Sequence, residues 1–448
     1  MKPGIPKGTR DFSPEQLVKR NYIFSTIRNV FKTYGYVPIE TPTMENLSTL
    51  TGKYGEEGDR LLFKILNNGN FLAKADKEAL ASGDSAKLTY SIADRGLRYD
   101  LTVPFARYVV MHQNDIVFPF KRYQIQQVWR ADRPQRGRFR EFYQCDVDVV
   151  GSESLMYEAE LAKIYDQVFD ELGLNVEIKI NNRKILFGIA EAAGIEDKFV
   201  DMTIAIDKMD KIGEEGVVKE LSGKGISQAS IDIILKVIKC NSLKALESYF
   251  EDCPAGKEGI AELRTFHNYA DRIEFKNNLS LDVSLARGLN YYTGCIFEVK
   301  AKDVEIGSIG GGGRYDDLTG VFGMKGVSGV GISFGAERIY LCLEELGLFP
   351  EHLSDTSTVI IVALDEASHL YGFSCLDKLR KAEISSELYP SPAKMKKQMK
   401  YANDRQFPYT LIIGSEEMES GKLLLKDMET GEQYKLSLDE IIQKLSSN

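Results

Sequence analysis

Two segments of the sequence carry side chains that could bind a small polar ligand. In the stretch SLARGLNYYTGCIFEV, which begins at Ser284, Arg287, Tyr291 and Tyr292 directly precede an apolar run that alternates as a strand does. One cation and two phenols could form a pocket that recognises a ligand by charge and hydrogen bonds. They could equally belong to a loop that leads into the strand, and the stretch alone supports both interpretations.

The second segment is a predicted β-hairpin. FKRYQIQQVWR and REFYQCDVDVVG both alternate, and the polar turn ADRPQRGRF separates them. Arg130 ends the first strand, and alternation places one set of side chains on a single face of the second: Phe142, Gln144, Asp146 and Asp148. A guanidinium opposite these carboxylates could be a cross-strand ion pair. It could also belong to a site for a substrate that brings an anionic and a cationic group together, as an amino acid condensing with ATP does.

The hairpin concentrates positive charge in a chain whose formal net charge is −9. Between residues 121 and 140 a single acid, Asp132, stands among seven basic residues: Lys121, Arg122, Arg130, Arg133, Arg136, Arg138 and Arg140. A solvated helix face usually mixes both signs, so this tract favours a bound anion. Arg338, at the head of a glycine-flanked helix in GVGISFGAERI, is a further candidate, although a helix-surface arginine fits its spacing equally well.

The four consecutive glycines at 310–313 match neither the dinucleotide-binding fingerprint nor the P-loop. They favour a place where the backbone passes close to a ligand or a packed strand.

Regular elements are predicted around these segments. A helix with a Ser cap begins at SPEQLVKR and ends before Gly35, and YVPIETP follows as a short strand suited to a sheet edge. A second amphipathic helix is predicted over residues 155–172. The chain is then helical from 184 to about 275, returns to strands, and ends in a β-α-β-α-β pattern typical of a small α/β domain with a mixed sheet.

Composition narrows the class of protein. The chain has 448 residues, which predicts two to four domains, and 43% hydrophobic with 27% charged residues is typical of a globular protein. We expect no membrane span, because no apolar stretch approaches roughly 20 residues. The first residues do not read as a secretory signal. Six single cysteines without a CxxC pair argue against a zinc ribbon and a disulfide framework and favour reduced, cytoplasmic thiols.

Taken together, these motifs make the chain resemble the class II aminoacyl-tRNA synthetases and, within that class, the histidyl-tRNA synthetase family. Three class motifs occur in order: the helix with YGYVPIETP, then VWRADRPQRGRFREF, then GVGISFGAER. The histidine-specific signatures are ARGLNYYTG, GGGGRYD and LRYDLTVPFARY. The resemblance covers nearly the whole length. It implies an α/β (α+β) fold in which an antiparallel sheet with flanking helices forms the catalytic domain, with a helical insertion and a C-terminal anticodon-binding domain.

The resemblance also implies roles for individual residues. For histidine it implies that Arg287 contacts the carboxylate and the α-phosphate region in place of a protein-bound metal, and that the remaining contacts come from Asp100, Thr102, Gln144, Asp148, Tyr291 and Tyr292. The first three of these would hold the α-ammonium and the last three would surround the imidazole. For ATP it implies Arg130 on the α-phosphate, Phe142 on the adenine, and four residues around the triphosphate: Asp132, Arg138, Arg140 and Arg338. One departure is that Asp100-Leu101-Thr102 replaces the Glu-Gly-Thr common in bacterial members.

By the same resemblance we expect a catalytic domain in two parts, 1–183 and 276–350, a helical insertion at 184–275 and an anticodon-binding domain at 357–448. The implied partners are ATP with Mg²⁺, L-histidine, tRNA(His) and a second copy of the chain, in the cytoplasm. The alternative is a catalytically inactive relative that senses histidine. We disfavour it because Arg130, Arg287, Arg338 and the C-terminal domain are all present.

Overall fold

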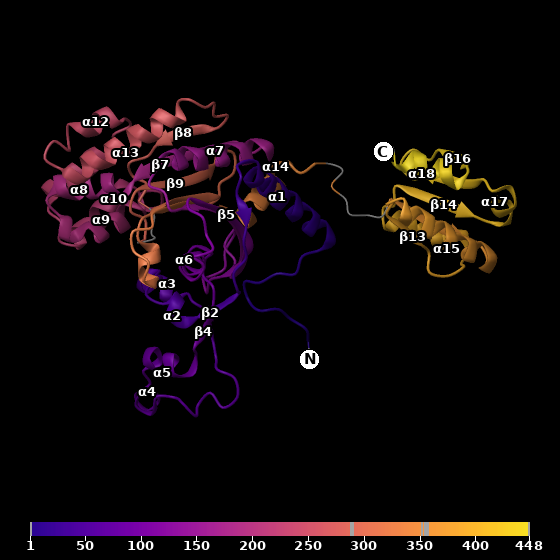
Figure 1. Ribbon diagram of the computed structural model, residues 1–448, viewed down its shortest axis with the longest axis horizontal. Coiled ribbons are helices and arrows are strands. Elements are labelled where there is room, and N and C mark those ends of the chain that lie inside the picture. Colours follow the sequence, from indigo (N-terminus) through magenta and orange to yellow (C-terminus); the bar gives the residue numbers. More distant parts are fainter. Residues whose placement is uncertain (1, 287–290, 351–352, 354–357, 447–448) are drawn as a thin grey trace. The chain divides into compact units, whose positions relative to one another are not determined.

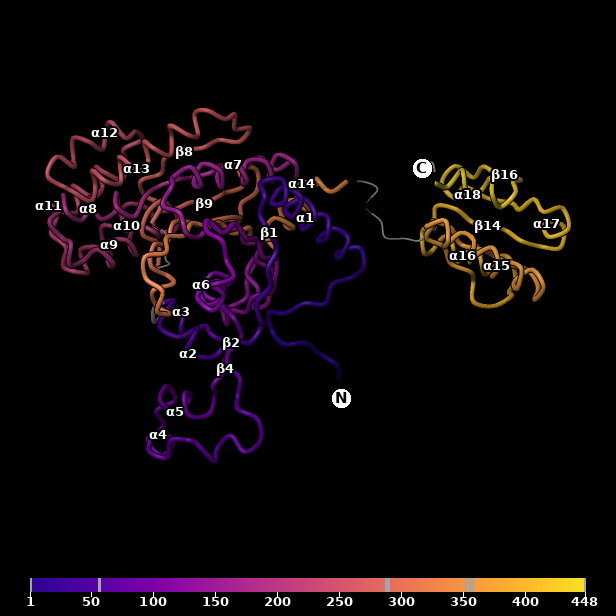
Figure 2. The backbone as a smooth tube through the Cα atoms, viewed as in Figure 1, coloured from indigo at the N-terminus to yellow at the C-terminus, as the bar shows by residue number. Residues whose placement is uncertain are grey.

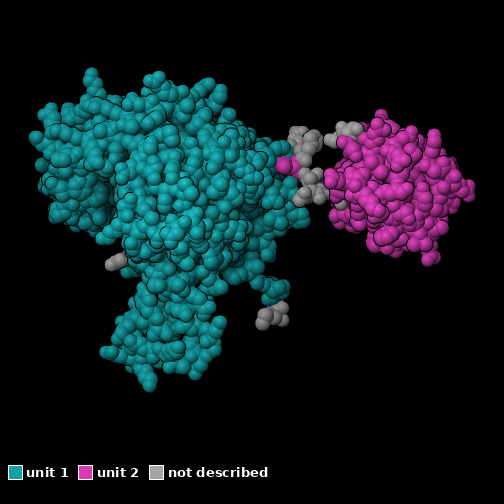
Figure 3. All heavy atoms as spheres, viewed as in Figure 1, with its two compact units in different colours: residues 1–351 teal, residues 352–448 magenta. Residues whose placement is uncertain are grey.

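The computed structural model describes residues 2–286, 291–350, 353 and 358–446. Its chain divides into two compact units, residues 1–351 and 352–448 (Figure 3). Within the described residues, no helix is both long and apolar enough to cross a membrane.

The first unit is built on an eight-stranded sheet (Figure 1). From edge to edge its strands are β1 (Val37–Pro38), β5 (Phe120–Trp129), β6 (Glu141–Val150), β11 (Gly329–Gly335), β10 (Gly310–Tyr315), β9 (Cys295–Ala301), β7 (Val176–Asn182) and β8 (Asn278–Leu281). The five inner pairings are antiparallel, whereas β1 and β8 join the two ends in parallel. The predicted hairpin of β5 and β6 and the predicted edge strand β1 are thereby confirmed.

One face of this sheet is covered by helices that complete the main core. They are α1 (Pro14–Thr33), α7 (Met156–Glu171) and α14 (Ala336–Leu346). The predicted Ser cap of α1 is present, because Ser13 and Gln16 form a reciprocal capping box. On β6 the apolar side chains Cys145, Val147 and Val149 belong to this core. Alternation therefore turns the polar residues of β6 to the opposite face.

Shorter elements adjoin the polar face of the sheet, and the segment of residues 66–94 among them projects away from it (Figure 2). They are a three-stranded sheet of β2 (Met44–Asn46), β4 (Arg95–Leu97) and β3 (Lys64–Ile65), the helices α2 (Leu47–Leu50), α3 (Gly55–Arg60), α4 (Lys77–Ser82), α5 (Ser85–Ile92) and α6 (Thr102–Met111), and the 3₁₀ turn η2 (Leu318–Phe322). A second core cluster joins α6 to this face through Val103, Phe105 and Val109. This packing fixes the start of α6, where Asp100 and Thr102 lie.

The helical stretch predicted from the sequence is present beside β7. It consists of α8 (Arg183–Ala193), η1 (Glu196–Lys198), α9 (Phe199–Ile206), α10 (Met209–Gly223), α11 (Gln228–Ile238), α12 (Leu243–Glu247) and α13 (Pro254–Ala270). Its apolar residues continue the main core without a break.

The glycine run at 310–313 lies in β10, between β9 and β11. A Cβ atom on Gly312 would overlap the carbonyl oxygen of Gly331, and one on Gly313 would overlap that of Cys295. The interpretation that these glycines allow close packing of backbones is therefore confirmed.

The second unit has a five-stranded mixed sheet, as predicted. Its strands in order are β13 (Ser386–Leu388), β12 (Val359–Ala363), β14 (Tyr409–Ile413), β15 (Leu423–Asp427) and β16 (Gln433–Leu436), of which the first three are parallel. Its helices are α15 (Glu366–Lys381), α16 (Met395–Asp404), α17 (Ser415–Ser420) and α18 (Leu438–Ser446).

Candidate active site

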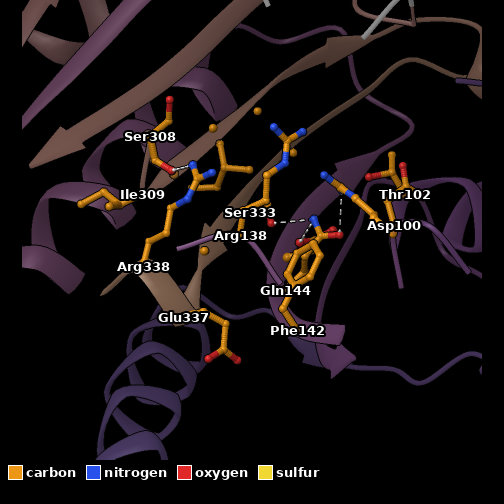
Figure 4. A pocket seen from close by; sticks show the side chains of 18 of the residues that line it. Asp100, Thr102, Arg138, Phe142, Gln144, Ser308, Ile309, Ser333, Glu337 and Arg338 are labelled. Carbon is orange, nitrogen blue, oxygen red and sulfur yellow. Dashed lines mark hydrogen bonds between the residues drawn. The ribbon is translucent and has the colours of Figure 1, made fainter. Parts of the chain in front are cut away.

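The polar face of the large sheet is hollowed into a cavity of about 310 Å³, within the range typical of small-molecule sites (Figure 4). Its walls come from the start of α6, the β5–β6 loop, β6, the segment before β9, β10, β11 and the start of α14. Most sequence-predicted site residues meet there: Asp100, Thr102, Arg130, Asp132, Arg138, Phe142, Gln144, Asp148, Tyr291, Tyr292 and Arg338. Residues separated by more than two hundred positions are thus brought to one face.

Asp148 lines the cavity and is 2% exposed. Its Oδ2 is 2.7 Å from the Arg122 guanidinium, an ion pair without the alignment of a hydrogen bond, and its Oδ1 accepts a hydrogen bond of 2.7 Å from the Tyr315 hydroxyl. Burial raises the pKa of Asp148, while Arg122 and the Tyr315 hydrogen bond lower it. A Cβ on Gly331 would overlap this carboxylate, so glycine is required opposite it on β11.

Asp100 is a second buried carboxylate, 3% exposed. Its Oδ1 accepts hydrogen bonds from the Tyr54 hydroxyl at 3.0 Å and from the Val103 backbone N–H at 3.1 Å. Its Oδ2 is buried without a hydrogen-bond partner among the described residues. Burial raises the pKa of this carboxyl, and the Val103 N–H and Arg130 oppose the shift. A buried acceptor that lines a cavity in this way suits a cationic ligand group.

The two adjacent tyrosines form one wall. The ring centroids of Tyr291 and Tyr292 are 4.8 Å apart, and Tyr291 meets Tyr315 edge-on at 6.3 Å. The Tyr291 hydroxyl also interacts with Thr102. Burial raises the pKa of Tyr291 well above its ordinary value, so this phenol stays neutral and can donate a hydrogen bond.

Three arginines line the other end of the cavity. Arg130 donates to the Tyr99 carbonyl at 3.1 Å and to Gln144 at 3.4 Å, and it stacks over the Tyr99 ring at 4.3 Å. Arg138 pairs with Asp132 at 3.0 Å. Arg338 donates to the carbonyl of Ser308 at 2.7 Å, which fixes it beside β10.

The remaining basic residues of the hairpin are turned to other partners. Arg140 is not among the cavity-lining residues; its guanidinium donates to the carbonyls of Asp132 and Lys7. Lys121 pairs with Glu160 at 2.7 Å, and Arg136 pairs with Glu345. The basic tract is therefore divided: Arg130 and Arg138 line the cavity, whereas other members have partners elsewhere. The expectation that the tract binds an anion stays a prediction. Arg287 lies outside the described residues.

Several residues in the cavity wall or directly behind it were missed by reasoning from the sequence. Arg122 and Tyr54 lie behind the wall, where they contact the lining carboxylates. Arg122 could have been found, since it lies directly opposite Asp148 in the hairpin register. Glu337 precedes Arg338, and its carboxylate binds Arg10 and Arg20 from the N-terminal segment. No spacing rule indicates the other three, whose positions depend on the folded chain: Tyr54, Ser333 and Tyr315.

An antiparallel sheet flanked by helices, with buried carboxylates at one end of its polar face and arginines at the other, defines the catalytic architecture of a class II aminoacyl-tRNA synthetase. The model of the histidyl-tRNA synthetase family matches residues 71–339, and that of the anticodon-binding domain matches residues 358–448. The chain belongs to the histidyl-tRNA synthetase family.

Individual relatives agree with this assignment. The chain is 58% identical to the histidine–tRNA ligase of Christiangramia forsetii over 446 residues, 98% of each chain. It is 56% identical to that of Bacteroides fragilis over 99% of each chain. Histidyl-tRNA synthetase from Nostoc sp. PCC 7120 superposes with a TM-score of 0.82 at 30% identity, covering 100% of this chain and 99% of that one. The predicted family, fold class and ligase activity are confirmed.

Proposed function

We propose that the cavity activates L-histidine with ATP to histidyl-adenylate and that the chain then transfers histidine to tRNA(His). The activity is that of its family. The observation that carries the assignment to this cavity is its division into a carboxylate end and an arginine end, which matches the two substrates of the first step.

Histidine occupies the carboxylate end in this proposal. Its α-ammonium is held by Asp100, Thr102 and Gln144. Asp100 offers an oxygen that has no hydrogen-bond partner in the part of the chain that the structure describes. Its imidazole lies between Asp148 and the tyrosine pair Tyr291 and Tyr292. Phenylalanine or leucine there would leave these buried polar groups unpaired, and such sites discriminate by roughly 10⁴ or more without editing.

ATP occupies the arginine end. Arg130 lies nearest to the carboxylate end and is placed for the α-phosphate, with Phe142 stacked on the adenine. Arg138 and Arg338 are placed for the β- and γ-phosphates, and Asp132, which pairs with Arg138, lies near them. Arg140 and Arg287 complete the set; Arg140 would have to leave the carbonyls that it binds in this structure.

The proposed chemistry needs no protein nucleophile. The histidine carboxylate attacks the α-phosphorus in line, pyrophosphate leaves, and a terminal ribose hydroxyl of the tRNA then attacks the activated carbonyl. The arginines neutralise charge that develops on the phosphate oxygens. The described residues contain no group of three His, Cys, Asp or Glu side chains placed to hold an ion, so Mg²⁺ would arrive on the phosphates of ATP, a binding mode that this ion favours.

The remaining parts receive supporting roles. We assign residues 1–183 and 276–350 to the catalytic domain, 184–275 to an insertion that clamps the acceptor arm, and 357–448 to anticodon binding. The exposed basic residues of α16, such as Lys400, could contact tRNA phosphates. We also propose a homodimer and a cytoplasmic location, the latter because the six cysteines are all free.

ATP–pyrophosphate exchange, with each of the twenty amino acids tested separately, decides the proposal. We expect exchange with histidine alone. Exchange with another amino acid would overturn the assignment of the imidazole pocket. Binding of histidine without any exchange would favour a histidine sensor.

A further inference from the structure

The side-chain amide of Gln144 is held from three sides at the carboxylate end. Its Nε2 donates to the Ser333 hydroxyl at 3.0 Å and to Asp146 Oδ1 at 3.5 Å, and its Oε1 accepts from Arg130 at 3.4 Å. Figure 4 shows Gln144 and Ser333 joined in this way. Ser333 lies opposite Asp146 in the β6–β11 register, and the interaction of its hydroxyl with the Asp146 carboxyl lowers the pKa of that carboxyl. The three side chains thus form a closed set on two adjacent strands.

We propose that Asp146 is a positioning residue that fixes the orientation of the Gln144 amide, so that the amide oxygen and not its nitrogen faces the substrate ammonium. This inference rests on the proposed function, in which Gln144 contacts that ammonium. An amide turned the other way would present N–H donors to a cation, which is repulsive.

The chemistry of the three groups explains why the carboxylate is needed. A serine hydroxyl both donates and accepts, so Ser333 alone would accommodate either orientation of the amide. An ionised carboxylate only accepts. Asp146 therefore accepts a hydrogen bond from the Ser333 hydroxyl and a second one directly from Nε2 of Gln144. The Ser333 oxygen is then left to accept the other hydrogen bond from Nε2 of Gln144. Both routes turn Nε2 of Gln144 toward Asp146.

Asp146 is 2% exposed and its surroundings make its charge sensitive to pH. On β5, Gln124 lies directly opposite Asp146 and Arg122 lies diagonally opposite it. On β6 itself Asp146 is flanked by Gln144 and Asp148. Ser333 faces it from β11, and Asp100 lies farther away. Burial raises the pKa of Asp146 to about 7; Asp148 and Asp100 add to the rise, whereas Arg122 and Ser333 oppose it. Once protonated, Asp146 can donate to the amide oxygen, and the orientation is no longer fixed.

The test measures binding by calorimetry to the full-length chain. The ligands are L-histidine and imidazolepropionate, which is histidine without its amino group. The proteins are wild type, Asp146→Asn, Gln144→Ala and the double variant. At pH 8 we expect Asp146→Asn to raise the histidine Kd about fivefold and Gln144→Ala about tenfold. The double variant should bind no more weakly than Gln144→Ala alone, and imidazolepropionate should be unaffected by Asp146→Asn.

Additive effects in the double variant would overturn the inference, because Asp146 would then touch the substrate itself. An unchanged histidine Kd in Asp146→Asn would also overturn it. Cys145→Ala is the matched control, since Cys145 is the neighbouring residue on the opposite face of β6; its histidine Kd should stay at the wild-type value. Failure of wild type to bind histidine would instead refute the proposed function, and a silent Gln144→Ala would refute the role of Gln144.

A second readout needs only wild-type protein, in case Asp146→Asn does not fold. The ring of histidine titrates at a lower pH than that of imidazolepropionate, because the ammonium disfavours its protonation. Each dissociation constant is therefore corrected for the separately measured ring titration of the free ligand, and the ratio of the corrected constants isolates the ammonium contact. We expect the preference for histidine over imidazolepropionate to fall severalfold between pH 8 and pH 6 as Asp146 becomes protonated. A constant ratio would contradict the inference.

Discussion

The two ends of the cavity are built in different ways. At the carboxylate end, Arg122, Asp146 and Asp148 lie on central strands and are each at most 2% exposed. At the arginine end, Arg138 lies in the β5–β6 loop and keeps 46% of its side chain exposed. In the proposed function, selection of the amino acid therefore depends on charges fixed inside the sheet, whereas the nucleotide meets at least one arginine, Arg138, that can adjust to the phosphates.

This difference has an energetic consequence. A charge that is taken out of water must be compensated by its neighbours, so the carboxylate end couples function to folding stability. An exposed arginine keeps most of its hydration, so the arginine end can be altered with little effect on folding. Mutations at the carboxylate end should therefore lower folding stability, whereas mutations at the arginine end should leave it nearly unchanged.

The largest effect is expected for Arg122→Met, which leaves the buried Asp148 without its ion-pair partner at 2.7 Å. Removing one partner of a buried pair costs roughly 3–5 kcal/mol, so we expect a loss of this size in the free energy of unfolding, measured by urea denaturation. Lys121→Met is the matched control on the same strand, and because Lys121 is partly exposed it should lose less than about 1 kcal/mol. Equal losses in both variants would contradict the comparison.

At the arginine end the largest effect should be on rate. Arg130→Ala should lower pyrophosphate exchange by about a hundredfold or more, because it removes charge stabilisation worth ~3 kcal/mol in the transition state. Its free energy of unfolding should change far less than that of Arg122→Met. Arg136→Ala, in the same loop but paired with the exposed Glu345, should keep the wild-type rate.

The same contrast explains how much could be predicted from the sequence. Alternation along β5 and β6 was sufficient to predict the hairpin and the shared face of Gln144 and Asp148, because a two-residue period is a local property. The order β6-β11-β10 was not accessible in this way. The register of such distant strands is set by tertiary packing. One such contact is that of Gly331 on β11, which has no Cβ and so leaves space for Asp148.

The role of each arginine could not be predicted from its charge. Arg122 and Arg140 belong to the same basic tract as Arg130, yet one is buried against Asp148 and the other binds backbone carbonyls. The pairing of Arg122 with Asp148 follows from the hairpin register and was accessible from the sequence. The contact of Arg140 with Lys7 was not, because only the fold brings these distant residues close.

A third prediction concerns pH and stability at the carboxylate end. The folded-state pKa of Asp146, about 7, lies above the roughly 4 expected in the unfolded chain. Its contribution to stability is therefore fully present below pH 4 and is lost as the pH rises to 7. We expect Asp146→Asn to be more stable than wild type at pH 8 by on the order of 4 kcal/mol, with this difference disappearing toward pH 4. A difference that is independent of pH, measured by urea denaturation, would exclude titration of Asp146 as its cause.

The smallest effect on folding is expected for Arg138→Ala. The Arg138 guanidinium lies 3.0 Å from the Asp132 carboxylate, and the Arg138 side chain is 46% exposed. Water can therefore replace this contact with little loss of free energy. We expect a change of less than about 0.5 kcal/mol in the free energy of unfolding, together with a KM for ATP raised about fivefold and an unchanged KM for histidine. Arg138→Lys keeps the charge but not the paired N–H donors, so it should recover only part of the ATP affinity.

A loss of stability in Arg138→Ala close to that of Arg122→Met would show that the arginine end is as tightly coupled to the fold as the carboxylate end. A KM that rises for histidine as well would mean that the two ends do not act separately.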